Sequence, residues 1–272
     1  MVEVIFEVGI NHNGDLGLAK KLIDVAHASG CQYVKFQKRT IDLVYSKEEL
    51  DKPRESPWGT TTRQQKEGLE FGYKEYVEID NYCKGKLFWF ASPWDVDSVD
   101  FLMKFDVPFI KVPSALMTNE TFLKKVRYTK LPVILSSGMC TLGMVDNAID
   151  ILGKDRIYAI LHCTSTYPSA PDEINAKIIP TMKELYPKFK VGFSNHYPGL
   201  HAMELAVAYG AEMIEFHGTL DRSMYGSDQA ASIEPNGVFE LMDRIMLTEQ
   251  MKGDGIKKIY DSEKPIMAKL RR

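Results

Sequence analysis

Three observations in the sequence predict a (β/α)₈ barrel, or TIM barrel, that forms a single α/β domain over residues 1–272. Eight short runs rich in β-branched and aromatic residues alternate with amphipathic stretches, which favours parallel strands joined by right-handed crossovers. A length of 272 residues suits eight such units. No glycine-rich dinucleotide loop follows the first run, so a doubly wound open sheet ranks second.

The expected strands are short and spaced along the whole chain. They cover residues 4–10, 33–37, 87–91, 109–112, 132–135, 158–163, 190–193 and 213–216. The clearest helix is expected over residues 16–29, where one face carries Leu18, Leu22, Val25 and Ala26. Residues 200–209 and 238–251 show the same spacing of apolar side chains, and a short tail is expected after the last of these helices.

One connection is much longer than the others. From residue 38 to about 72 the sequence shows no clear periodicity and is rich in charge, with Pro53, Pro57 and Gly59. Connections of this length in a compact domain are usually lids or disordered segments. We therefore expect a long loop over about 38–72 that acts as a lid. If it closes over an acceptor substrate, deletion of residues 55–59 is predicted to raise the KM for that acceptor more than the KM for the other substrate.

Composition excludes several classes of function. The net charge of −3 offers no general attraction for nucleic acid. The chain begins with a strand-like run rather than a signal peptide, and no apolar stretch reaches the length of a membrane span. Four scattered cysteines without a CxxC pair indicate reduced thiols in the cytoplasm. The basic cluster Lys269, Arg271 and Arg272 is expected to be a solvated terminus.

Polar residues stand at all eight expected strand ends, which is where a TIM barrel carries its active site. Lys35 and Lys111 lie within apolar strands, where a lysine is costly to bury unless it meets an anion. Hydroxyl and backbone N–H groups nearby could hold the same anion, and they belong to Ser114, Ser136, Ser137 and Ser194. This pattern predicts a phosphate-bearing substrate; the alternative is that both lysines snorkel to solvent.

Two histidines, His196 and His217, end adjacent strands, close enough to share a divalent ion. Two nitrogen ligands with open positions suit Mn²⁺, Co²⁺, Zn²⁺ or Fe²⁺. The alternative is a pair of histidines that only form hydrogen bonds with their neighbours. Glu7 and Asp228 are candidates for substrate contacts or acid–base groups, although residue type alone would favour ordinary surface or supporting carboxylates.

Several long motifs resemble the N-acylneuraminate (sialic acid) synthase family, in order and over nearly the whole chain. They are Glu-Val-Gly-Ile-Asn-His-Asn-Gly-Asp at 7–15, Val-Lys-Phe-Gln at 34–37, Lys-Val-Pro-Ser at 111–114, Ser-Ser-Gly-Met at 136–139, His-Cys-Thr-Ser-Thr-Tyr-Pro at 162–168, Gly-Phe-Ser-Asn-His at 192–196 and residues 216–232. The resemblance implies a TIM-barrel transferase that joins phosphoenolpyruvate to an N-acyl hexosamine or related aldose, releasing phosphate and forming a nonulosonic 2-keto acid.

The resemblance also implies residue roles. Phosphoenolpyruvate would be held by Lys35, Ser92, Lys111, Ser114, Ser136, Ser165 and Ser194. The sugar would contact Glu7, Gln37, Tyr167 and Asp228. A divalent metal (Mn²⁺, Mg²⁺ or Co²⁺) on His196 and His217 would polarise the sugar aldehyde. The residues expected to take part in catalysis are Glu7, Lys35, Lys111 and His217. A homodimer is a further expectation from the family.

The sequence departs from the family pattern at three places. Leu116 stands where the family usually has a glutamate, so Glu7 or Glu215 would have to serve in its place. The chain is expected to be a short form without the antifreeze-like C-terminal domain of many members. Ser92 and Ser165 match positions that are often Thr and Asn, which can also bind phosphate.

Two other functions remain open at this point. Lys111 could form a Schiff base in an aldolase or lyase. Alternatively, the chain could be a non-catalytic protein that binds phosphoenolpyruvate, which Leu116 would favour. The sequence does not indicate which sugar is the acceptor.

Overall fold

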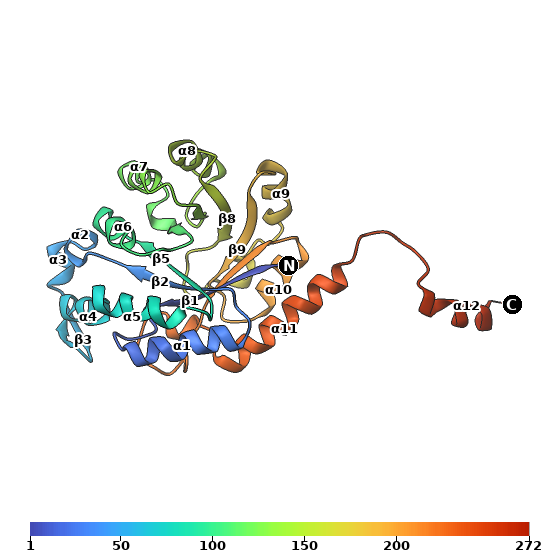
Figure 1. The fold of residues 1–272 in the computed structure, drawn as a ribbon, viewed down its shortest axis with the longest axis horizontal. Helices are drawn as coiled ribbons and strands as arrows, with labels where there is room; N and C mark the ends of the chain where they lie inside the picture. The colour runs from blue at the N-terminus through green and yellow to red at the C-terminus, as the bar shows by residue number, and fades with distance from the viewer. Residues whose placement is uncertain (272) are drawn as a thin grey trace.

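Eight parallel strands close into a barrel surrounded by helices in the computed structural model, which describes residues 1–271 (Figure 1). In spatial order the strands are β1 (Glu3–Gly9), β10 (Met213–His217), β9 (Lys190–Asn195), β8 (Ile157–Cys163), β7 (Val133–Ser136), β6 (Ile110–Val112), β5 (Phe88–Pro93) and β2 (Tyr33–Lys38), which pairs again with β1. The predicted TIM barrel is confirmed, and all eight expected runs are strands.

The outer helices follow the strands in the βα order that the alternation predicts. They are α1 (Leu16–Ala28), α5 (Tyr73–Cys83), α6 (Val96–Leu102), α7 (Glu120–Tyr128), α8 (Leu142–Leu152), α9 (Ile178–Leu185), α10 (His201–Ala208) and α11 (Pro235–Lys252). Helix α1 begins where the Asp15 side chain accepts a hydrogen bond from the Leu18 backbone N–H. Its buried face contains Ala19, Leu22, Ile23 and Ala26, so the predicted face is rotated slightly: Leu18 and Val25 are only half-buried.

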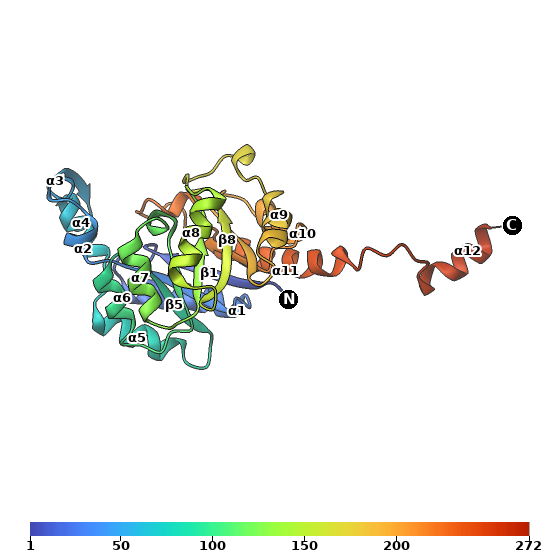
Figure 2. The ribbon, with the colours of Figure 1, turned by 90° about the horizontal axis from the view of Figure 1, so that it is seen from above.

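The segment over 38–72 is not the irregular loop that the sequence predicts. It contains α2 (Ile41–Val44), α3 (Lys47–Leu50), a hairpin of β3 (Pro53–Ser56) and β4 (Gly59–Thr61), and α4 (Thr62–Leu69). Helix α4 starts with a capping box between Thr61 and Gln64. These elements are too short to produce a visible hydrophobic period in the sequence. They form a small unit at one side of the barrel (Figure 2), and its role as a lid stays a prediction.

The C-terminal end extends away from the barrel beyond α11. Helix α12 (Lys264–Leu270) stands apart from the other elements in both views (Figures 1 and 2). Lys269 and Arg271 are exposed, as expected for a solvated terminus, and Arg272 lies outside the described residues. Within residues 1–271, no helix combines the length and the apolar character needed to span a membrane.

Candidate active site

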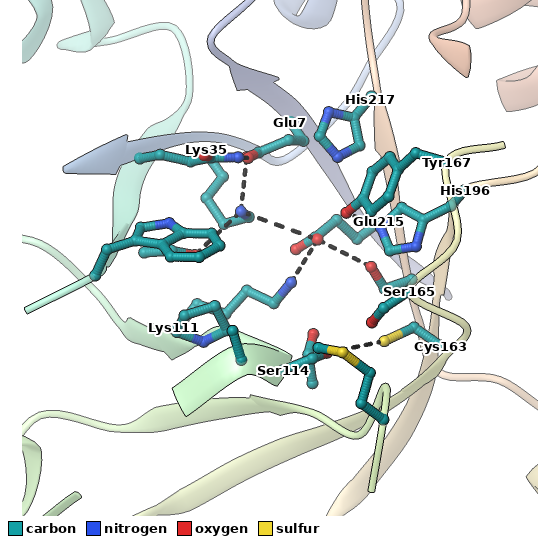
Figure 3. Close-up of a pocket in the computed structure, with 18 residues that line it drawn as sticks. Glu7, Lys35, Lys111, Ser114, Cys163, Ser165, Tyr167, His196, Glu215 and His217 are labelled. Carbon is teal, nitrogen blue, oxygen red and sulfur yellow. Dashed lines mark hydrogen bonds and ion pairs between the residues drawn. The ribbon is translucent and has the colours of Figure 1, made fainter. Parts of the chain in front are cut away.

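A cavity of about 250 Å³ opens at the carboxyl ends of the barrel strands, and every strand contributes to its wall. Its lining includes most of the polar residues that the sequence places at strand ends (Figure 3). They are Glu7, Lys35, Gln37, Ser92, Lys111, Ser114, Ser136, Ser165, Tyr167, Ser194, His196 and His217. The sequence therefore identified the position of the cavity and almost all of its polar wall.

Two buried lysines and two buried glutamates form a charged floor. The Lys35 Nζ lies 2.7 Å from Glu7 Oε2 and 3.9 Å from Glu215 Oε1. Lys111 Nζ lies 2.5 Å from the same Glu215 oxygen, which also accepts a hydrogen bond of 3.0 Å from Ser194 Oγ. All four charged side chains are at most 6% exposed. Because isolated charges are costly to bury, this mutual pairing is what allows the lysines to remain inside the barrel.

Burial and pairing shift the pKa values of this floor. Burial opposes the charge on Glu215, but Lys111 and Lys35 more than offset it, lowering the pKa of that carboxyl group to about 2. Burial lowers the pKa of Lys111, and Glu215 acts in the opposite direction. Glu215 is thus an anion that holds both ammonium groups at one side of the cavity, as Figure 3 shows.

Serine hydroxyls line the wall beside Lys111. Ser114 Oγ accepts a hydrogen bond of 3.1 Å from the Gly138 backbone N–H, and Ser136 Oγ is buried without a hydrogen-bond partner in the described chain. A Cβ atom on Gly138 would lie 2.2 Å from Ser165 Oγ and 2.7 Å from Ser114 Oγ. Only glycine therefore lets the backbone approach these hydroxyls, and the result is a compact group of donors beside a cation.

The histidines lie on the other side of the cavity. The pairing of Phe216 with Asn195 brings the next residues, His217 and His196, side by side, with ring centroids 5.7 Å apart. His196 Nδ1 lies 2.5 Å from the Thr164 carbonyl oxygen and donates to it. Nε2 is then an acceptor, and the Tyr167 hydroxyl donates to it at 2.6 Å. Burial, and secondarily His217, lower the pKa of His196 to about 3, so this imidazole is neutral at pH 7.

These histidines fit two ligands of a divalent metal, provided that the metal displaces the Tyr167 hydroxyl from His196 Nε2. His217 Nδ1 is buried without a hydrogen-bond partner in the described chain and lies 3.6 Å from Asp228 Oδ2. An imidazole nitrogen that carries no proton is a suitable metal donor. Among residues 1–271 no three His, Cys, Asp or Glu side chains are grouped to hold a metal by themselves, so the remaining positions would belong to substrate or water.

Gln37 lies beside the charged floor and bonds to one of its glutamates. Its Nε2 donates to Glu7 Oε1 at 2.7 Å. Gly9, at φ +53°, turns the end of β1 in front of this pair; a Cβ there would lie 3.3 Å from both Gln37 Nε2 and Glu7 Oε1, and 3.4 Å from His217 Nδ1. Because glycine has no Cβ, the polar atoms of Gln37, Glu7 and His217 are not crowded at this turn.

Two predicted site residues lie outside the cavity wall, and several wall residues were not predicted. Asp228 does not line the cavity, although its carboxylate approaches His217. Ser137 does not line it either, and its hydroxyl donates to the Leu161 carbonyl at 3.1 Å. Trp94 and Cys163 line it without having been assigned a role. Glu215, which the sequence offers only as a substitute for the missing glutamate, is at the centre of the charged floor. Leu116 packs against the hydrophobic core and is not among the lining residues.

Comparison with known proteins gives the family. The model of the NeuB family matches residues 22–257, which is most of the chain. The chain belongs to the NeuB family. The resemblance to the N-acylneuraminate synthases is confirmed, and so is the enzyme class, a transferase that condenses phosphoenolpyruvate.

Relatives in this family differ in their products. The chain is 37% identical to an N,N'-diacetyllegionaminic acid synthase of Campylobacter jejuni, over 96% of this chain and 80% of that protein. It is 34% identical to the human N-acetylneuraminate-9-phosphate synthase, over 98% of this chain and 76% of that protein. A crystal structure of the N-acetylneuraminic acid synthetase of Leptospira borgpetersenii, in complex with citrate, superposes with a TM-score of 0.86 at 31% identity, covering 100% of this chain and 93% of that one.

Proposed function

We propose that the protein condenses phosphoenolpyruvate with an N-acyl hexosamine or a related aldose, forming a nonulosonic 2-keto acid and releasing phosphate. The observation that carries this proposal is the arrangement of the cavity. It has two buried ammonium groups and several hydroxyls on one side and two imidazoles on the other. Such a site can hold a small, strongly anionic substrate beside a metal-bound carbonyl.

The lysine side would bind phosphoenolpyruvate. Lys35 and Lys111 would neutralise its phosphate and carboxylate, and hydroxyl groups would donate to the remaining oxygens. The orphaned Ser136 hydroxyl supports this role, because a buried donor without a partner in the protein is available to a ligand. The other hydroxyls are those of Ser92, Ser114, Ser165 and Ser194.

The histidine side would hold the acceptor sugar and a divalent metal. His196 and His217 would be its protein ligands, and Mn²⁺, Mg²⁺ and Co²⁺ are the candidates. When bound, the metal supplies Lewis-acid polarisation of the sugar aldehyde. The hydroxyl and acyl groups of the sugar would contact Glu7, Gln37, Tyr167 and Asp228. The Tyr167 hydroxyl already bonds to His196, so it would lie between the metal ligand and the sugar.

The carbon–carbon bond forms when C3 of phosphoenolpyruvate attacks the aldehyde carbon. Water then adds at C2, and phosphate leaves with cleavage of its C–O bond. Glu7 and Glu215 are the carboxylates nearest the lysines and would order this water, a role that Leu116 cannot perform. Lys35 and Lys111 would stabilise the charge on the departing phosphate.

The relatives are named for different products, so the identity of the acceptor sugar has to come from an assay. Candidates are N-acetylmannosamine, its 6-phosphate, mannose and a diacetamido sugar. Phosphate release from phosphoenolpyruvate with Mn²⁺ should be measured for each, with mass detection of the keto acid. Release with one sugar would support the proposal. Absence of release with every sugar would contradict it and would favour a protein that only binds phosphoenolpyruvate. A homodimer and a cytoplasmic location remain predictions suggested by the family.

A further inference from the structure

One row of side chains on β2 rises from the charged floor of the cavity toward its opening. Lys35, Gln37 and Arg39 occupy every second position, and side chains two residues apart in a strand point to the same face. Lys35 lies in the floor and Gln37 bonds to Glu7 above it. The Arg39 guanidinium donates a hydrogen bond to Gln37 Oε1. Arg39 therefore continues the row one step beyond the last residue of the strand.

The neighbouring strand β5 carries a matching row. Gln37 pairs with Ser92 in the barrel register, and the Trp94 backbone N–H donates to the Lys38 carbonyl at 2.9 Å, which extends the pairing past both strands. Trp94 lines the cavity. The Arg39 guanidinium carbon lies 4.4 Å from the centre of the Trp94 ring, so the guanidinium rests on the indole face.

The donors of this pair are only partly used. Arg39 Nε and Trp94 Nε1 are buried and have no hydrogen-bond partner within residues 1–271. Among these residues, no carboxylate forms an ion pair with the Arg39 side chain, and the nearby Glu70 carboxylate bonds instead to Lys38 Nζ and the Arg39 backbone N–H. A buried donor without a partner costs free energy of folding. The two N–H groups are therefore expected to donate to a bound ligand, which would remove this cost.

The Arg39–Trp94 pair differs in this respect from the cations of the floor. Lys35 and Lys111 are each balanced by a glutamate, whereas the Arg39 charge is balanced by none among the described residues. The two lysines are suited to the small anion deep in the barrel. Arg39 is not itself among the residues that line the cavity, but it contacts two that are, Gln37 and Trp94, at the end of the β2 row. An acceptor sugar that extends along this row, away from its reacting aldehyde, would reach the pair.

We propose that Arg39 and Trp94 form a specificity subsite for the end of the acceptor sugar that lies farthest from its aldehyde. The guanidinium and indole N–H groups would donate to oxygen atoms of a substituent, either a phosphate ester or an N-acyl carbonyl. This inference rests on the proposed function, because it needs a sugar in the cavity. It assigns Arg39 to substrate recognition rather than to the reacting atoms.

The test measures sugar binding and turnover separately. N-acetylmannosamine, its 6-phosphate, a diacetamido hexose and mannose would be titrated calorimetrically into metal-free protein that is saturated with phosphoenolpyruvate. The variants are Arg39→Met and Trp94→Phe. The matched control is Arg54→Met, an exposed arginine in β3 for which the structure records no side-chain interaction. KM values for sugar and for phosphoenolpyruvate would then be compared with Mn²⁺ present.

Arg39→Met is expected to weaken binding of the recognised sugar roughly tenfold to a hundredfold, the range for a lost hydrogen bond to a charged group. The KM for phosphoenolpyruvate should change less than about twofold, and mannose, which has neither substituent, should lose nothing. A loss confined to the 6-phosphate would identify a phosphate ester, and a loss shared by the acylated sugars would identify a carbonyl.

The subsite is refuted if Arg39→Met and Arg54→Met bind every sugar alike, or if the wild-type protein binds none of them. An equal rise in the KM for phosphoenolpyruvate would also refute it, because it would indicate a general disturbance of the cavity. Normal sugar binding without phosphate release would leave the subsite supported and would contradict the proposed reaction instead. The two failures are therefore distinguishable.

Discussion

The lysine side and the histidine side of the cavity differ in how they carry charge. On the lysine side, two ammonium groups are buried with Glu7 and Glu215, and the carboxyl group of Glu215 has a pKa of about 2. On the histidine side, burial keeps His196 neutral, with a pKa of about 3. One side carries fixed charges that balance each other, and the other carries a neutral imidazole beside a second histidine.

This difference suggests how one small cavity could serve two unlike substrates. When an anion binds to the lysine side, an ammonium group can move from its glutamate to the anion and remain paired. Neutral imidazoles do not repel a cation and can bind a metal at pH 7. Figure 3 shows both groups within one site, separated mainly by Glu215 and Tyr167.

The largest effect is expected from Lys111→Met, which breaks the lysine side. Phosphate release should fall about 10³-fold, because a donor to the developing phosphate charge is lost. The free energy of unfolding should fall by about 3 kcal/mol, since Glu215 keeps its buried charge without its closest partner. Urea unfolding and the phosphate assay would measure the two effects.

The double variant Lys111→Met/Glu215→Gln separates stability from function. Removing both charges should recover most of the lost stability but none of the activity. If the double variant stayed as unstable as the single variant, the interpretation of the floor as a balanced charge set would be wrong.

The next largest effect is expected on the histidine side. His196→Asn should lower Mn²⁺-dependent turnover about 10²-fold, the scale of a lost metal interaction, and chelation of the metal should lower the wild-type rate in the same way. Binding of phosphoenolpyruvate to the metal-free protein should change little in this variant. Calorimetry of both proteins would test this, and a large loss of phosphoenolpyruvate affinity would contradict the division into two sides.

Much of this division could be predicted from the sequence. Lysines inside apolar strands and histidines at adjacent strand ends are local signals, and the barrel brings strand ends together whatever its loops do. The central position of Glu215 was harder to predict, because it depends on three strands meeting at one carboxylate. The contact of Arg39 with the cavity wall was not predicted, although Arg39 follows Lys35 by four residues and Gln37 by two, a spacing that places all three side chains on one face of a strand.

The segment over 38–72 illustrates the other limit of the sequence. Its elements are held by short caps and by contacts with distant residues, such as Trp58 against Tyr225 with ring centroids 5.6 Å apart. Contacts of this kind produce no periodic pattern in the sequence. The short elements of this segment can therefore be recognised only when the residues that they pack against are known.

A smaller effect should appear in the pH dependence of stability, and it would show whether burial alone keeps an imidazole neutral. His12 stacks on Phe71 with ring centroids 4.0 Å apart and does not line the cavity; burial lowers its pKa from 6.5 to about 3. The unfolded state therefore binds more protons between pH 6.5 and pH 3, and the folded state loses stability as the pH falls through this range.

His12→Asn should reduce the stability lost between pH 7 and pH 5 by about 2 kcal/mol, at 1.36 kcal/mol for each pH unit. Urea unfolding at both pH values would measure this. The exposed His27→Asn serves as the control for removing a histidine from the surface, and only His12→Asn is expected to show the full reduction. An unaltered slope in His12→Asn would mean that His12 is not buried in its neutral form.

The smallest effect is expected from Trp58→Ala, which loosens the predicted lid while leaving both sides of the cavity in place. The sugar KM should rise about threefold, in line with the loss of one aromatic pair, and the KM for phosphoenolpyruvate should stay constant. Trp58→Phe, which keeps an aromatic ring, should behave almost as the wild type. Equal changes in the two KM values would argue against a lid over the sugar.

The most direct test of the two-sided cavity is calorimetric titration of metal-free protein with phosphoenolpyruvate. It would compare the wild type, Lys111→Met and His196→Asn. The account predicts that the wild type and His196→Asn bind phosphoenolpyruvate with similar affinity and that Lys111→Met loses most of it. Equal affinities in all three proteins, or equal losses in both variants, would contradict the assignment of the anion to the lysine side.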